Sequence, residues 1–279
     1  MTPRRDHSLA LTQLALFLLG SLAWVLLLTI STGALARAAG STSLELDQVI
    51  ELLGPGFLGY TSILQIVGLG GLALGLAHQL PPSPHGPGLR EILGIRRASP
   101  GWTLAAGIGG LTIWTFPSWW ATRLAEGSEQ PSTVELITET LIQDPLSQTW
   151  PLIFAIVVTA PLIEEIIFRG YLWSVLGHLG PPILVFLGSS ALFALYHLDP
   201  LHVITLLPTA LFFGLLRWGS GSIGPCVLAH FVNNAIGVLA TQLSPGGEEQ
   251  PLGLLPAVLG LIVAYASVSA VWAMSRRTP

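Results

Sequence analysis

Two adjacent glutamates, Glu164 and Glu165, lie in one of the most apolar stretches of the 279-residue chain, and Arg169 follows in the same stretch. A charged side chain at the centre of a membrane helix opposes insertion by roughly 2.5–3.5 kcal/mol. Glu165 and Arg169 are four residues apart, so they share one helix face and can neutralise each other. Glu164 lies about 100° away around the helix axis and has no partner within its own helix. Glu164 is therefore the carboxylate that is predicted to be free to react.

Polar side chains on two later apolar segments could supply partners for Glu164. His197 ends one apolar segment, and His230 and Asn234 share a face of another because they are four residues apart. At 1.5 Å per residue from the inner turns, Glu164, His197 and Asn234 lie about 20–24 Å deep, whereas His230 is shallower at about 13 Å. The depths place a candidate site inside the bilayer.

Proline and glycine shape the helices around this site. Pro161 cannot donate to the carbonyl of Val157, so we expect a kink there and a bare acceptor at which polar groups gather. The glycine-rich stretches 68–71 and 107–110 are expected to allow close packing of helices.

The composition places these segments in a membrane. The chain is 51% hydrophobic and 9% charged, against about 25% charged residues in a typical soluble domain. Eight apolar windows are present, most of them near the roughly 20 residues that a spanning helix requires. They cover residues 9–30, 57–79, 102–121, 149–168, 181–197, 201–216, 223–243 and 252–274. The sequence predicts an all-α, polytopic bundle of about eight transmembrane helices, one integral membrane domain over residues 1–279, in which the short fifth and sixth windows form a steep hairpin.

Arginines indicate the orientation of this bundle, since the chain has no lysine. The segments on the side of the termini hold Arg4, Arg5, Arg90, Arg96, Arg97, Arg217, Arg276 and Arg277, and those on the other side hold Arg37 and Arg123. The positive-inside rule then places both termini in the cytoplasm. A short interfacial helix is expected over residues 89–97 and an amphipathic helix between 126 and 148.

Three short motifs together carry a family resemblance. Glu164-Glu165 followed by Arg169, Phe193 followed by His197, and His230 followed by Asn234 stand in this order on apolar segments. They resemble the three motifs of the CPBP family, the intramembrane endopeptidases related to the type II prenyl-protein (CAAX) protease and to bacteriocin-immunity proteins. The resemblance covers roughly residues 150–240, the expected catalytic core, and the stretch 214–225 resembles the family's lead-in to its last motif.

The resemblance implies a helical bundle around a polar cavity in which a peptide bond of a membrane-associated protein or peptide is hydrolysed. Glu164 would be the general base that activates water. Glu165 would mainly hold Arg169. His197 would orient the water or donate to the leaving amine, and His230 with Asn234 would stabilise the developing oxyanion. The expected partners are the lipid bilayer and a membrane-associated protein or peptide, and no nucleic-acid partner is expected.

A zinc variant would use some of the same atoms. Glu164, His197 and His230 could hold Zn²⁺ with a fourth position open for water. The chain lacks the H-E-x-x-H spacing of ordinary zinc proteases, and a neutral Asn234 beside His230 suits an oxyanion donor. A glutamate mechanism without a cofactor is therefore favoured.

Two other classes of protein stay open. A proton-coupled transporter could relay protons through Glu164, His197 and His230, although the sequence shows no sign of the inverted repeats of transporters. A scaffold or pigment-binding protein could use the histidines or the nine tryptophans as contacts. Asp199 and His202, which flank the second motif, are interpreted as turn residues outside the site.

Overall fold

The computed structural model of the protein describes residues 3–40, 52–80, 88–125, 133–143, 146–243 and 252–275. These residues form helices and turns and contain no strand, which confirms the all-α prediction. The helices are α1 (Pro3–Ala38), α3 (Pro55–Ala77), α4 (Leu89–Leu93), α5 (Pro100–Ile113), α6 (Thr115–Ala125), α7 (Thr133–Gln143), α8 (Leu146–Phe154), η1 (Ala155–Thr159), α9 (Ala160–Glu165), η2 (Ile166–Leu172), α10 (Trp173–Gly177), α11 (Pro182–Leu195), α12 (Pro200–Ser220), α13 (Gly224–Leu243) and α14 (Leu254–Ser275).

Among the described residues, six helices are long and apolar enough to cross a membrane. They are His7–Ala38, Gly56–Ala77, Leu146–Gly177, Pro200–Ser220, Gly224–Leu243 and Leu254–Ser275. The fifth predicted window, α11, is a helix of only 14 residues. The third window, 102–121, is not one continuous helix, so the number of about eight spans stays a prediction.

The third window is divided at Trp114 into α5 and α6. Pro117 lacks the N–H group that would bond the carbonyl of Ile113, four residues earlier, in a continuous helix. The loss of this hydrogen bond explains why α5 ends at Ile113.

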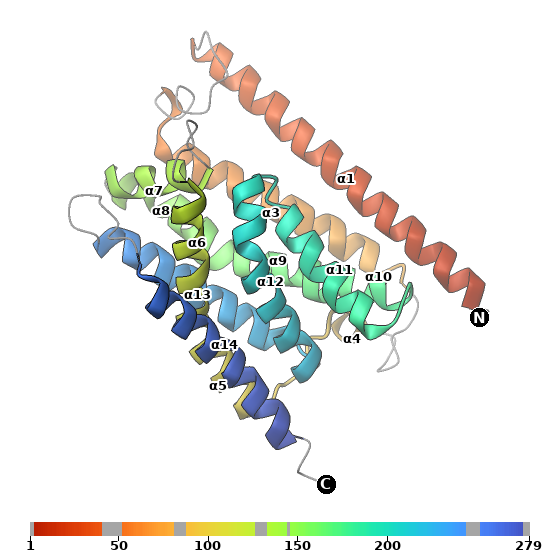
Figure 1. Ribbon diagram of the computed structural model, residues 1–279. Coiled ribbons are helices and arrows are strands. Elements are labelled where there is room, and N and C mark those ends of the chain that lie inside the picture. The colour runs from red at the N-terminus through yellow and green to blue at the C-terminus, as the bar shows by residue number, and fades with distance from the viewer. Residues whose placement is uncertain are drawn as a thin grey trace.

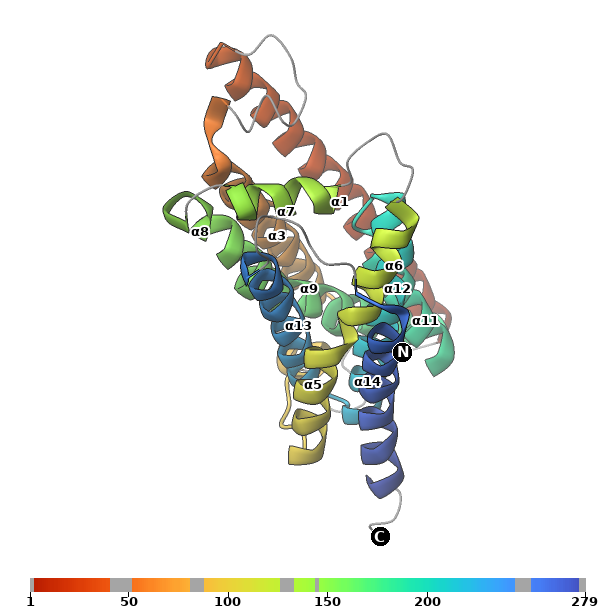
Figure 2. The ribbon, with the colours of Figure 1, turned by 60° about the vertical axis from the view of Figure 1, so that its left-hand side comes forward.

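The third of the six spans, from α8 through α10, lies in the middle of the bundle. Of its apolar 18-residue window, 56% is buried inside the protein, whereas the corresponding share for the span in α1 is 6%. Figures 1 and 2 show α9 between α3 and α13, and α1 at the edge of the bundle beside α3. The helix that carries the two glutamates therefore has protein neighbours on most sides.

Two π-helical segments, η1 and η2, interrupt this central span. In η1 the Ala160 N–H bonds the carbonyl of Ala155, five residues earlier. Such π segments are frequent at functional sites because they shift the register of the side chains that follow.

Glycines allow neighbouring helices to approach closely, as predicted for the stretches 68–71 and 107–110. A Cβ atom at Gly110 of α5 would lie 2.6 Å from the Ala229 carbonyl oxygen of α13. A Cβ atom at Gly70 of α3 would lie 2.5 Å from the side chain of Ile163 in α9. Glycine thus allows α3 to pack closely against α9, the helix of the two glutamates. It also allows α5 to pack closely against α13, the helix of His230.

The smaller predicted elements are also present. The interfacial helix expected over 89–97 is α4, which ends earlier, at Leu93, because Gly94 adopts a left-handed conformation with φ 71°. The amphipathic helix expected between 126 and 148 is α7. The proline-rich turn 81–87 and the acidic loops 41–51, 126–132 and 244–251 lie outside the described residues.

The two ends of the chain lie on the same side of the bundle. Figure 1 shows the N-terminal end of α1 and the C-terminal end of α14 both at the lower right ends of their helices. The arrangement agrees with termini on one side of a membrane, and their placement in the cytoplasm stays a prediction.

Candidate active site

Glu165 is the centre of a buried group of charged side chains. Its Oε1 atom accepts a hydrogen bond of 3.1 Å from Arg169 Nη1 and lies 3.0 Å from His230 Nδ1. Glu165 and Arg169 are fully buried, and His230 is 5% exposed. The predicted pair of Glu165 with Arg169 is confirmed, and the structure adds His230 to it.

Arg169 also has contacts with two other helices. Its Nη2 donates to the Ala210 carbonyl of α12 at 2.8 Å. Its guanidinium carbon lies 4.3 Å from the ring centroid of Phe193 on α11 and 5.5 Å from that of Phe213 on α12. A buried ion pair is tolerated only where hydrogen bonds and neighbouring groups offset the loss of water. These contacts supply part of that compensation and join α11 and α12 to the central span, while Arg169 Nε and Glu165 Oε2 are buried without a hydrogen-bond partner in the described part of the chain.

Glu164 differs from its neighbour in having no hydrogen-bond partner among the described residues. It is 5% exposed, and it interacts electrostatically with His230, Glu165 and Arg169. The prediction that Glu164 has no partner within its own helix is therefore confirmed. The later-helix partners expected for it make their side-chain hydrogen bonds to other groups among the described residues, although His230 interacts with it electrostatically. Its role as a general base stays a prediction.

The two histidines each have one ring nitrogen fixed by an acceptor. His230 Nδ1 faces a carboxylate oxygen, and His197 Nδ1 lies 3.0 Å from the Phe193 carbonyl oxygen. Because both oxygens accept hydrogen bonds, Nδ1 carries the hydrogen in each ring. The Nε2 atom of each imidazole is then left available for another partner.

Asn234 satisfies the acceptor that is left bare near the predicted kink. Its Nδ2 donates to the Ile156 carbonyl at 2.8 Å. The sequence predicted Val157 as the bare acceptor, and this is corrected by one residue. In the π register of η1 the donor to Ile156 would be Pro161, five residues later, which has no N–H group. Asn234 thus commits one amide hydrogen to the backbone, and its role toward an oxyanion stays a prediction.

The sequence estimate placed His230 at a different depth from Glu164. In the structure His230 Nδ1 lies 3.0 Å from Oε1 of Glu165, the residue next to Glu164. His230 and the two glutamates therefore lie at the same level of the bundle.

Comparison with protein families covers the segment that holds all of these residues. Residues 146–236 match the family model described as Type II CAAX prenyl endopeptidase Rce1-like. Over this segment, which is less than half of the chain, the protein is similar to the Rce1-like family. The resemblance expected from the three motifs is confirmed, since the match extends from before Glu164 to beyond Asn234. Searches of curated proteins and of solved structures found no match. The family and the six apolar helices together make the chain a multi-pass membrane protein.

Phe193 lies between the two histidines of the Rce1-like segment. Its ring centroid is 5.4 Å from that of His197 and 5.7 Å from that of His230. Phe213 stacks on His230 with centroids 4.9 Å apart and an interplanar angle of 28°. The motif identified Phe193 from the sequence, but nothing in the sequence distinguished Phe213 from other apolar residues of α12.

Two residues that the sequence analysis did not assign also lie near Glu164. The ring of Tyr196 is 5.6 Å from that of Phe168, one turn after Glu164, and its hydroxyl interacts electrostatically with Glu164. Gln65 Nε2 of α3 donates to the Tyr196 hydroxyl at 3.5 Å. Tyr196 precedes His197 in the second motif, which was the only available signal for it.

Asp199 and His202, at the turn between α11 and α12, were both predicted to be turn residues outside the site. The Asp199 carboxylate accepts from the backbone N–H groups of Leu201 and His202 and so caps α12, as expected of a turn residue. The ring of His202, predicted to lie outside the site, is 4.7 Å from that of His197. His202 is therefore a neighbour of the site.

Glu164, His197 and His230 are the three side chains that the zinc variant would use as metal ligands. Within the described residues, no group of three or more His, Cys, Asp or Glu side chains is arranged to hold one. His230 instead directs Nδ1 to Glu165, which was not among the three predicted ligands. The described residues therefore do not fit a preformed metal site with these three ligands.

Proposed function

We propose that the protein is an intramembrane endopeptidase in which Glu164 activates the attacking water. The observation that supports this most strongly is the difference between the adjacent glutamates. Glu165 is occupied by Arg169 and His230, whereas Glu164 is unpaired in the same buried group. An unpaired carboxylate at the edge of a buried charged group is suited to accept a proton from water.

In this mechanism Glu164 removes a proton from water, and the oxygen attacks the scissile carbonyl carbon. His197 Nε2 accepts a hydrogen bond from the second O–H group of the water and so orients it, since Nδ1 of the same ring is fixed by the Phe193 carbonyl. This second hydrogen stays on the attacking oxygen. Glu164 then passes its proton to the leaving amine as the C–N bond breaks. The products are an amine and a carboxylic acid, so every atom of the water is accounted for.

The oxyanion of the intermediate would be stabilised from α13. Glu165 fixes the His230 ring through Nδ1, so Nε2 would donate to the oxyanion when the ring is protonated, and the negative charge of the oxyanion would then balance the added proton. The second amide hydrogen of Asn234, which the Ile156 carbonyl does not use, is a further donor.

The Tyr196 hydroxyl has a supporting role in this proposal. It accepts from Gln65 and its own hydrogen would be available to donate to the attacking water. Loss of one such hydrogen bond corresponds to about a ten-fold lower kcat. Tyr196→Phe is expected to lower kcat by that amount and to leave the stability of the fold unchanged.

The experiment is peptide cleavage by the full-length protein in proteoliposomes. A membrane-inserted peptide substrate is incubated in H₂¹⁸O, and mass spectrometry identifies the products. Hydrolysis places ¹⁸O in the new carboxyl group, and Glu164→Gln is expected to abolish it. Glu139→Gln, an exposed glutamate on α7, is the matched control and should cleave at the wild-type rate. A wild-type protein that never cleaves, or that cleaves as well after Glu164→Gln, contradicts the proposal.

A chelator tests the zinc variant in the same assay. Cleavage that is unchanged by a chelator supports the glutamate mechanism. Cleavage that a chelator abolishes and zinc restores would replace it with a metal mechanism.

A further inference from the structure

A second feature lies beside the candidate site, on the outside of the two helices that carry it. A groove of about 580 Å³ runs between the central span and α13. Its lining consists of Ile95, Arg96, Val158, Pro161, Leu162, Ile166, Ser222, Ile223, Gly224, Val227, Leu228 and Phe231. Leu162 is 47% exposed and Phe231 is 41% exposed, so the groove is open toward the surroundings of the bundle.

The length of the groove matches part of one membrane leaflet. Val158 and Ile166 at its two ends on the central span are eight residues apart, which corresponds to about 12 Å at 1.5 Å per residue. Half of a hydrocarbon core of about 30 Å is about 15 Å. A single acyl chain that enters from one surface therefore fits along the groove without crossing the membrane midplane.

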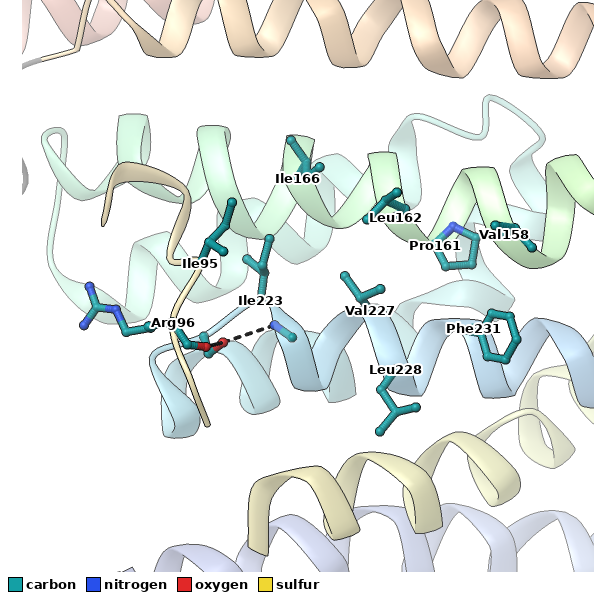
Figure 3. A pocket seen from close by; sticks show the side chains of 12 residues that line it. Ile95, Arg96, Val158, Pro161, Leu162, Ile166, Ile223, Val227, Leu228 and Phe231 are labelled. Atoms are coloured by element: carbon teal, nitrogen blue, oxygen red, sulfur yellow. Dashed lines mark hydrogen bonds between the residues drawn. The ribbon is translucent and has the colours of Figure 1, made fainter. Parts of the chain in front are cut away.

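The charged residue at one end of the groove indicates which end faces the membrane surface and which lipid head group would be bound there. Arg96 is the only charged residue among those that line it. Figure 3 shows Arg96 at one end, with its guanidinium directed away from the apolar side chains, and Phe231 and Val158 at the opposite end. Arg97, the next residue, is also exposed. Arginines at a membrane surface attract anionic head groups.

The backbone at this end of the groove is fixed by hydrogen bonds. The Ser222 hydroxyl donates to the Arg96 carbonyl at 2.7 Å and accepts from the Gly224 N–H at 3.2 Å. Arg96 is thereby held at the start of α13, where the apolar wall of the groove begins.

We infer that this groove binds one acyl chain of an anionic phospholipid, with the phosphate at Arg96. The inference is independent of the proposed function, because it rests on the groove and not on Glu164. A bound chain would fill the space between the helix of Glu165 and the helix of His230 on their outer side.

A second hollow provides an internal comparison. It has a volume of about 700 Å³ and is lined by Ala98, Pro100, Thr103, Leu104, Gly107, Ile108 and Leu111. None of these residues is charged, so this hollow has no group that would select an anionic head group.

The test is native mass spectrometry of the full-length protein, delipidated in detergent. The protein is titrated with phosphatidylglycerol or with phosphatidylcholine of the same acyl chains. We expect the first phosphatidylglycerol to bind at least about five-fold more tightly than phosphatidylcholine, and Arg96→Gln to reduce this ratio below about two-fold. Val227→Trp and Leu162→Trp, which fill the groove, should each remove the first phosphatidylglycerol site. Leu104→Trp, in the second hollow, should leave it unchanged.

Several results would overturn the inference. These are equal binding of the two lipids by the wild type, an unchanged preference after Arg96→Gln, or a first site that Leu104→Trp removes as well as Val227→Trp does. If both groove-filling variants fail to fold, the ratio in Arg96→Gln still decides the outcome.

Discussion

His230 Nδ1 and Arg169 Nη1 reach the same carboxylate oxygen, Oε1 of Glu165, at 3.0 and 3.1 Å. The oxygen joins α13 to the central span inside the bundle. Glu165 thus links two helices through its contacts with Arg169 and His230. The neighbouring Glu164 has no hydrogen-bond partner in the described part of the chain. Substitutions of these two adjacent glutamates are therefore expected to have different effects.

Removing one member of the buried ion pair should cost more than removing both. Arg169→Met leaves Glu165 charged in the core, and we expect a loss of about 3–5 kcal/mol in the free energy of unfolding. The double variant Glu165→Gln, Arg169→Met should lose less than Arg169→Met alone, because no uncompensated charge remains. Unfolding in mixed micelles measures both values. Equal losses in the single and the double variant would refute the pairing.

The hydrogen bond from Asn234 to the Ile156 carbonyl is expected to be needed because Pro161 has no N–H group to offer this carbonyl. Asn234→Leu leaves this acceptor unsatisfied and should destabilise the protein by about 1–3 kcal/mol. Pro161→Ala restores an N–H group five residues after Ile156, so the same Asn234→Leu change should cost less in that background. Strict additivity of the two substitutions would show that Pro161 does not create the vacancy that Asn234 fills.

Phe193 is expected to position three functional groups at once. Phe193→Leu removes the ring beneath Arg169 and between His197 and His230, at a cost of up to about 2 kcal/mol for the cation–π contact. Both kcat and stability should fall. Phe186→Leu is the control on the same helix, since its ring packs on Trp218 with centroids 5.4 Å apart. The idea fails if Phe186→Leu lowers kcat as much as Phe193→Leu does.

Gly110 is expected to hold α5 against α13 near His230. Gly110→Val would place Cβ 2.6 Å from the Ala229 carbonyl oxygen, and overpacking of this kind costs about 1–3 kcal/mol. Gly107→Ala is the matched control on α5, because a Cβ there meets nothing within 4 Å. Thermal unfolding of the two variants should separate them clearly. A stable Gly110→Val protein would argue against the close contact of α5 with α13.

Local relationships could be predicted from the sequence, and long-range register could not. The pairing of Glu165 with Arg169 and the lack of a partner for Glu164 within its own helix follow from helix geometry alone. The contact of His230 with Glu165 could not be predicted, because it depends on how α13 packs against the central span. Counting residues from the expected inner turns does not fix the position of one helix relative to another.

The carbonyl group left without a backbone donor by Pro161 could also be predicted only in part. A proline in an apolar helix predicts one unsatisfied carbonyl, and the sequence correctly indicated that a polar group would gather there. Whether that carbonyl belongs to Val157 or to Ile156 depends on the π register of η1. No pattern within the helix predicts this register, since the donor that stabilises it, Asn234, comes from α13.

The separation of roles between Glu164 and Glu165 is tested most directly by measuring kcat for peptide cleavage and the free energy of unfolding for Glu164→Gln and Glu165→Gln side by side. We predict that Glu164→Gln lowers kcat by about 10²–10⁴-fold and leaves the free energy of unfolding at the wild-type value. Glu165→Gln should lower the free energy of unfolding by about 3–5 kcal/mol, because Arg169 loses its buried counter-charge. A Glu164→Gln variant that cleaves at the wild-type rate, or that unfolds as readily as Glu165→Gln, would contradict the account.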